Sequence, residues 1–202
     1  FTPETKDALQ TAVDLWVTDN ETALSTYDEI NTWDVSLITD MSGLFHNTSF
    51  GDDISNWDVS NVTNMEQMFT SAWAFNQDLS SWDVSNVTNM TAMFMSSSLG
   101  CEEHGSVDND NSLSGWNVSS VTNMKQMFWN SGCFNGDITG WDVSNVISME
   151  VMLANAPFTH DVSSWDISNV SYMDLMFGSS NDLSDEVECA LQAAFQSNDA
   201  WP

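Results

Sequence analysis

Five aspartates follow a tryptophan at regular intervals, and they are the residues of this sequence best suited to bind a metal ion. They are Asp34, Asp58, Asp83, Asp142 and Asp166, and Asn117 takes the equivalent place in one further copy. If the copies stack as strands about 4.8 Å apart, neighbouring carboxylates repel each other by about 1 kcal/mol in water. Bound Ca²⁺, which takes carboxylate oxygens as ligands, would offset this repulsion. Hydrogen bonds from the serine two residues later, or from backbone N–H groups, are the alternative.

A second set of aspartates lies between these copies. It comprises Asp53, Asp78, Asp137, Asp161 and Asp182. We expect these side chains to accept hydrogen bonds from backbone N–H groups within turns, which is a common role of aspartate, with metal binding as the alternative. The three histidines, His46, His104 and His160, show no zinc-site spacing with each other or with the cysteines.

Three cysteines allow one disulfide and leave one thiol over. Cys101 and Cys133 follow Phe94 and Phe128 at similar distances, so stacking of the copies would bring them together. We predict a Cys101–Cys133 disulfide, with two buried thiols as the alternative. Cys189 would then remain, either buried in the fold or paired with a cysteine outside this sequence.

Both sets of aspartates belong to a repeat. The stretch WDVSNVTNMEQMF begins at Trp57 and WDVSNVTNMTAMF begins at Trp82. Copies of this motif open at Trp33, Trp57, Trp82, Trp116, Trp141 and Trp165, with steps of 24, 25, 34, 25 and 24 residues. The long step contains SLGCEEHGSVDNDNS, which indicates an insertion near residues 98–112.

The spacing of the large apolar residues predicts the form of one unit. Leu79, Trp82 and Val84 have the spacing of a turn followed by a strand, and Val87, Met90 and Met93 suggest a helical or 3₁₀ return. One such unit cannot bury its own apolar side, so neighbouring units must cover it. We therefore predict an α/β repeat solenoid, right-handed and leucine-rich-repeat-like, with six coils of about 25 residues.

The pattern L-x-x-W-x-V-x-x-V-x-x-M resembles the strand signature of leucine-rich repeats. More closely, W-D-V-S-N-V-T-N-M-x-x-M-F resembles the repeat of BspA-like surface proteins of the DUF285 type, over roughly residues 27–184. The resemblance implies an extracellular or cell-surface protein linked to adhesion and recognition. It brings no catalytic residues.

Both ends of the sequence predict helices that cap the repeats within a single domain, 1–202. Residues 1–26 would form an N-terminal helical cap, with Thr2 as N-cap and an apolar stripe of Leu9, Ala12, Val13 and Trp16. Residues 27–184 would hold the six repeats, and residues 185–202 a C-terminal helical cap that follows Ser184. We find neither a signal peptide nor an apolar run of membrane-spanning length, which suggests a mature form or a fragment.

The charge restricts the partners. The formal net charge is −28, and Lys6 and Lys125 are the only basic residues besides the histidines. Nucleic acid is therefore excluded as a partner, because phosphate binding needs a basic surface. A protein or a polysaccharide surface remains as the ligand of what we expect to be a monomeric domain.

We therefore expect a non-enzymatic, extracellular or cell-surface recognition or adhesion module that presents an extended acidic face, without a cofactor unless Ca²⁺ binds. One alternative is a structural subunit of an extracellular fibre or coat, although the capped ends speak against it. Another is an ice-binding protein, because Thr63, Thr88 and Thr122 recur in a regular row. That row is interrupted by Ile147 and Ser171.

Overall fold

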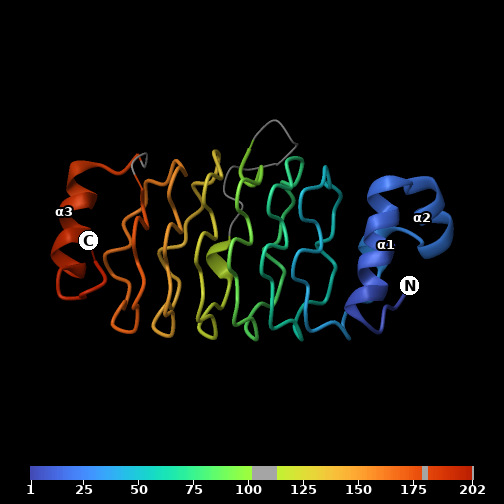
Figure 1. Cartoon of the computed structure of the whole chain (residues 1–202), viewed down its shortest axis with the longest axis horizontal. Helices are drawn as coiled ribbons and strands as arrows, with labels where there is room; N and C mark the ends of the chain where they lie inside the picture. Colours follow the sequence, from blue (N-terminus) through green and yellow to red (C-terminus); the bar gives the residue numbers. More distant parts are fainter. Residues whose placement is uncertain (102–112, 179–181, 202) are drawn as a thin grey trace.

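A computed structural model describes residues 1–101, 113–178 and 182–201. Its helices are α1 (Lys6–Thr18), α2 (Asn20–Tyr27) and α3 (Asp185–Phe195), together with the short 3₁₀ helices η1 (Ile30–Thr32) and η3 (Leu113–Gly115). The molecule is elongated, with α1 and α2 at one end, α3 at the other, and the repeats side by side between them (Figure 1). The histidine His104 and most of the predicted insertion lie outside the described residues.

The predicted α/β leucine-rich-repeat-like solenoid of six coils is wrong. In the described ranges the repeats contain neither an extended strand nor an α-helical return, and no sheet forms. The β-pairing between neighbouring repeats is limited to isolated parallel bridges, one per pair, from Asp40↔Asn64 at one end to Ser148↔Tyr172 at the other. The described repeats therefore do not form a leucine-rich solenoid.

Large apolar residues recur at every third position in the repeat, and the structure explains this spacing by turns and not by the predicted strand and helical return. The N–H of Val62 donates to the Val59 carbonyl at 2.9 Å, and the N–H of Met68 donates to the Met65 carbonyl at 3.2 Å. Each of these two steps thus closes a β-turn, whereas between them the N–H of Met65 donates to the Asn89 carbonyl of the next repeat. Two apolar residues at the ends of such a turn lie on the same side of the chain, as they would in a 3₁₀ helix. The repeat is therefore a series of tight turns.

Bonds between repeats alternate with these local turns. In the second repeat the N–H groups of Met65, Gln67 and Phe69 donate to carbonyls of the third repeat at 2.8–2.9 Å. The intervening residues bond locally, and Gln67 has a φ of 56°. A left-handed residue at the corresponding place recurs as Ala92, Gln126, Val151 and Leu175. An extended strand cannot continue through such a residue, which explains why each bridge stays isolated.

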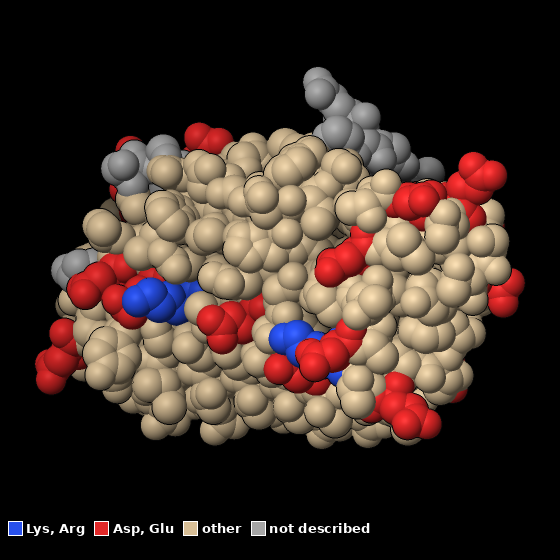
Figure 2. Space-filling view, turned by 45° about the vertical axis from the view of Figure 1, so that its right-hand side comes forward, with Lys and Arg blue, Asp and Glu red and all other residues tan. Residues whose placement is uncertain are grey.

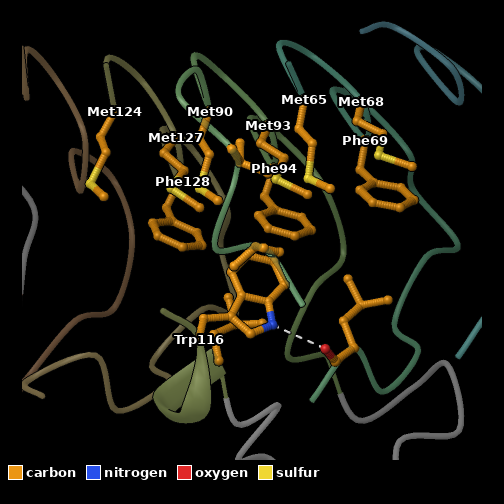
Figure 3. Close-up of a cluster of buried hydrophobic side chains, with 14 of the residues drawn as sticks. Met65, Met68, Phe69, Met90, Met93, Phe94, Trp116, Met124, Met127 and Phe128 are labelled. Carbon is orange, nitrogen blue, oxygen red and sulfur yellow. Dashed lines mark hydrogen bonds between the residues drawn. The ribbon is translucent and has the colours of Figure 1, made fainter. Parts of the chain in front are cut away.

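The repeated tryptophan, valine, methionine and phenylalanine side chains form one continuous core. Methionines and phenylalanines of successive repeats lie in parallel rows (Figure 3). Phe69, Phe94 and Phe128 are fully buried, and neighbouring rings in this row stack with centroids 5.5 and 5.7 Å apart. This stacking distance lies in the favourable range for aromatic pairs. The core therefore depends on each repeat covering the next.

The tryptophans also join the repeats through hydrogen bonds. The indole N–H of Trp82 donates to the Ile54 carbonyl at 3.2 Å, and that of Trp116 donates to the Leu79 carbonyl at 3.0 Å (Figure 3). Trp57 and Trp141 make the same kind of bond to the repeat before them. Trp165 is the exception, because its buried indole nitrogen has no partner among the described residues.

This difference predicts unequal effects of the same substitution. We expect Trp82→Phe to lower the free energy of unfolding by about 0.5–1.5 kcal/mol more than Trp165→Phe, because only Trp82→Phe removes a hydrogen bond. The Ile54 carbonyl keeps its bond from the Trp57 N–H, so it is not left without a donor. Urea denaturation of the two variants measures the difference. Equal losses would show that the indole hydrogen bonds add nothing beyond ring packing.

Capping side chains fix both terminal helical segments. The N-cap of α1 is Thr5, whose hydroxyl accepts from the N–H of Ala8 at 3.2 Å, so the predicted Thr2 cap is wrong by three residues. The apolar stripe of Leu9, Ala12, Val13 and Trp16 is buried as predicted. At α3, Ser184 accepts from the N–H of Val187 at 3.3 Å, and Leu191 and Phe195 are the buried residues.

Candidate binding surface

The aspartates that follow the tryptophans lie exposed along the repeats. Oδ1 of Asp34 accepts from the N–H of Ser36 at 3.2 Å and from its hydroxyl at 2.6 Å. Asp58 and Asp142 repeat both bonds, and Asn117 does so with its amide oxygen. Asp83 and Asp166 accept from the N–H of the serine two residues later at 3.0 Å. Each carboxylate is thus held by its own turn.

These local bonds favour the ionised form of the carboxyls. The serine hydroxyl and then the serine N–H hold the pKa of Asp34, Asp83, Asp142 and Asp166 below the ordinary aspartate value. Repulsion from Asp166 partly opposes this shift at Asp142. Hydrogen bonding, which was the alternative to calcium in the sequence, is therefore present at every member of the row.

The structure gives no further support to a calcium site at this row. Among the residues it describes, no three His, Cys, Asp or Glu side chains gather closely enough to hold a metal ion. Calcium binding by Asp34, Asp58, Asp83, Asp142 and Asp166 stays a prediction of the sequence.

Thermal unfolding in EDTA and in millimolar Ca²⁺ tests that prediction at fixed ionic strength. If the row binds calcium, Ca²⁺ at about ten times Kd should stabilise the folded state by about 1.4 kcal/mol, because it binds only that state. The variant Asp58→Asn, which copies the natural Asn117, should reduce this rise. The same Tm in EDTA, Mg²⁺ and Ca²⁺ would remove the metal prediction.

The second set of aspartates acts within turns, as predicted, at four of its five positions. Asp53, Asp78, Asp137 and Asp161 each accept from the N–H two residues later, at 2.8–3.0 Å. At Asp137 the Thr139 hydroxyl, followed by the Thr139 N–H, lowers the pKa of the carboxyl. Asp182 is exposed beside α3. These carboxylates therefore help to shape the turns.

Asparagine and threonine rows connect each repeat to the one before it. The amides of Asn61, Asn86, Asn145 and Asn169 donate to serine carbonyls of the preceding repeat at 2.7–2.9 Å. The hydroxyls of Thr63, Thr88 and Thr122 donate to threonine carbonyls of the preceding repeat at 3.1–3.2 Å. All of these side chains are exposed, yet each is fixed to the backbone of a neighbouring repeat.

The asparagine row has one gap, at Ser120. This shorter side chain makes no bond to the Ser85 carbonyl in the described structure. We expect Ser120→Asn to restore the missing link and to raise the free energy of unfolding by about 0.5–1 kcal/mol, the net value of one hydrogen bond. Thermal unfolding would measure it, with Ser80→Asn, outside the row, as the control. A gain shared by both variants would contradict the explanation.

A shallow groove lies beside this gap. Its volume is about 750 Å³, and it is lined by Ser119, Ser120, Thr122, Asn145, Ile147, Asn169 and Ser171. The walls are mainly hydroxyl and amide groups, which can both donate and accept hydrogen bonds. The aspartate row and the asparagine and threonine rows together form what we call the polar surface.

Basic residues contribute little to the surface charge. Lys6 Nζ lies 3.3 Å from Asp40 Oδ1, and Lys125 Nζ lies 3.0 Å from Glu150 Oε2. In Figure 2 the lysine atoms lie against acidic atoms. Both lysines are thus already paired with a carboxylate, and the aspartate rows keep their negative charge.

A disulfide fixes the two ends of the segment that contains the insertion. The structure joins Cys101 and Cys133, with Cα atoms 5.1 Å apart. Gly100 enters this corner with a φ of 87°, and a Cβ there would lie 2.7 Å from the Cys133 carbonyl oxygen. Cys189 is exposed on α3, so the expectation that it is buried is wrong. The position of Cys189 in the sequence does not by itself predict that its side chain lies on the solvent-facing side of α3.

Taken together, these features define a repeat protein with a long polar surface whose side chains are held in place by bonds between repeats. The chain belongs to the family described as Mycoplasma protein of unknown function, DUF285, which matches residues 11–103 and 100–193. No curated protein and no solved structure matches the chain. None of the helices in the described ranges has the length and apolar character needed to cross a bilayer.

Proposed function

We propose that this protein is a non-enzymatic recognition or adhesion module that acts outside the cell or at its surface. The observation that carries the proposal is the polar surface. Exposed aspartate, asparagine and threonine side chains recur along the molecule, and neighbouring groups fix their orientation. A surface ordered before binding loses less conformational entropy when a ligand arrives.

Two further features support this proposal. The Cys101–Cys133 disulfide suits an oxidising compartment. The repeat W-D-V-S-N-V-T-N-M-x-x-M-F supports assignment to the BspA-like surface proteins within the family. The ligand that fits best is a polysaccharide or protein surface with hydrogen-bonding groups at repeated intervals, because the polar surface offers its own groups at repeated intervals.

Binding assays on immobilised polysaccharides and extracellular matrix proteins test the proposal. The matched variant carries asparagine at all five aspartates of the row, since Asn117 shows that asparagine forms the same turn. We expect the wild-type protein to bind at least one of these surfaces and the variant to lose most of that binding at an unchanged Tm. Failure of the wild type to bind any of them, or equal binding by both proteins, would contradict the proposal.

Sedimentation velocity separates this function from that of a fibre or coat subunit. A recognition module is expected to stay monomeric as its concentration rises. Growing polymers would favour assembly.

A further inference from the structure

The last two repeats place apolar side chains on the surface where earlier repeats place polar ones. Ile147 takes the place of Thr122, and Tyr172 takes that of Asn123. Leu175 takes a place held by Gln126 in the fourth repeat and by Val151 in the fifth. The exposed fractions of these side chains are 47% for Ile147, 57% for Tyr172 and 67% for Leu175. The core needs none of these changes, because at each of the three places at least two earlier repeats fold with a polar residue. A local gathering of exposed apolar groups is typical of an interaction site.

Two of these residues adjoin, and the third lies beside a groove. The N–H of Tyr172 donates to the Ile147 carbonyl at 3.2 Å, so the two residues adjoin across neighbouring repeats. Leu175 also lines a groove of about 270 Å³ between the last repeat and α3. Other lining residues are Met173, Met176, Leu183, Leu191 and Trp201. Small-molecule sites are commonly about 300–1,000 Å³, so this groove better suits one or two inserted side chains.

The rim of the groove is acidic and lacks a paired cation. Glu188 lines the groove, and Asp174 is exposed next to Leu175. Asp185 and Glu186 also stand in the first turn of α3. The two ion pairs of the described structure use Asp40 and Glu150, not these carboxylates.

This charge distribution distinguishes between the two ligands that the apolar groove could bind, a second copy of the chain and a cationic segment. A second copy would bring another chain of net charge −28, with the same acidic rim. Opposed like charges disfavour such a contact. A segment with an apolar side chain and neighbouring lysine or arginine residues complements both parts of the site. The apolar side chain fills the groove, and the cations pair with the acidic rim.

We propose that the groove between the last repeat and α3 binds a short cationic peptide segment of a partner protein through an apolar anchor. A leucine or aromatic side chain enters beside Leu175 and Trp201, and the flanking cations lie near Glu188 and Asp174. The apolar anchor supplies the affinity, as buried anchors commonly do at interfaces. The acidic rim selects the partner and speeds its association. This site uses residues separate from the aspartate row, so it can exist whether or not that row binds a ligand.

Fluorescence anisotropy with a labelled peptide, KKGLFGKK, tests this inference on the complete chain. Two control peptides separate the contributions, since KKGSSGKK keeps the charge without the anchor and EEGLFGEE keeps the anchor with the opposite charge. We expect saturable binding of KKGLFGKK and binding at least about tenfold weaker for each control, as expected when an anchor or its charge complement is lost.

Matched protein variants locate the binding. Leu175→Gln copies Gln67 and Gln126, which occupy the same left-handed position, so the fold should be kept. Leu37→Gln makes the same chemical change at a distant leucine that is 57% exposed, against 67% for Leu175. We expect Leu175→Gln to weaken KKGLFGKK binding about tenfold and Leu37→Gln to leave it unchanged. Glu188→Gln should weaken binding at low salt and have less effect at high salt.

Three results would overturn the inference. One is the absence of saturable KKGLFGKK binding, and another is an equal response of Leu175→Gln and Leu37→Gln. Equal binding of KKGSSGKK would show attraction by charge alone. Sedimentation velocity addresses the remaining occupant, because a wild-type dimer that Leu175→Gln abolishes would assign the groove to a second copy.

Discussion

Replacing Phe128 by alanine is expected to lower the free energy of unfolding by about 3–5 kcal/mol, the usual cost of removing a buried phenylalanine ring. The ring is fully buried, and its centroid lies 3.7 Å from Phe134 and 5.7 Å from Phe94. It therefore contacts its own repeat and the preceding one. The cavity would interrupt the row of rings near the middle of the molecule, where repeats on both sides depend on it.

The fifth repeat supplies the control for this experiment, because it carries Leu153 where the fourth carries Phe128. Phe128→Leu keeps an apolar side chain of moderate size and should cost clearly less than Phe128→Ala. Urea denaturation followed by tryptophan fluorescence and by circular dichroism measures both variants. A loss below about 1 kcal/mol for Phe128→Ala would be atypical of buried phenylalanine and would contradict the continuous core described above.

Removing the disulfide is the second large change. We expect the double variant Cys101→Ser, Cys133→Ser to lose about 3–4 kcal/mol, because a link between residues 32 apart restricts the unfolded chain. At about 2–4 °C per kcal/mol for a chain of this size, the Tm should fall by roughly 6–16 °C. Calorimetry of the oxidised protein, the reduced protein and the double variant measures the effect.

Cys189→Ser is the matched control, since this exposed thiol is free. Its effect should stay within about 0.5 kcal/mol, as is usual for surface substitutions. If the double variant kept the wild-type Tm, the disulfide would not contribute to stability under the conditions used. A large loss in Cys189→Ser would instead indicate a contact of α3 that its exposure does not suggest.

The polar surface was partly predictable because its residues recur at fixed positions in the repeat. Turn bonding by Asp53, Asp78 and Asp137 follows from a local preference of aspartate, and two residues suffice to form it. The bonds of Asn86 and Thr88 to the preceding repeat could not be assigned to particular atoms. Those partners lie about 25 residues away, and their distance depends on how the repeats are placed in space.

The sequence alone determined which residues recur, and therefore which side chains share a row. Identical neighbours in each copy impose the same local turn, so Trp82 and Trp116 occupy the same layer of the core in successive repeats. It also determined that helical segments flank the repeats, because capping and a 3.6-residue apolar stripe are local signals.

The tertiary structure decided the backbone of the repeat itself. A step of three between apolar residues fits a 3₁₀ helix or a β-turn, and both place the side chains on one side. The choice depends on whether each N–H bonds to its own repeat or to the next one, as Met68 and Phe69 do respectively. The groove beside Leu175 likewise exists only where α3 meets the last repeat. Such contacts join chain segments that are distant in the sequence, so they cannot be predicted from the spacing of neighbouring residues.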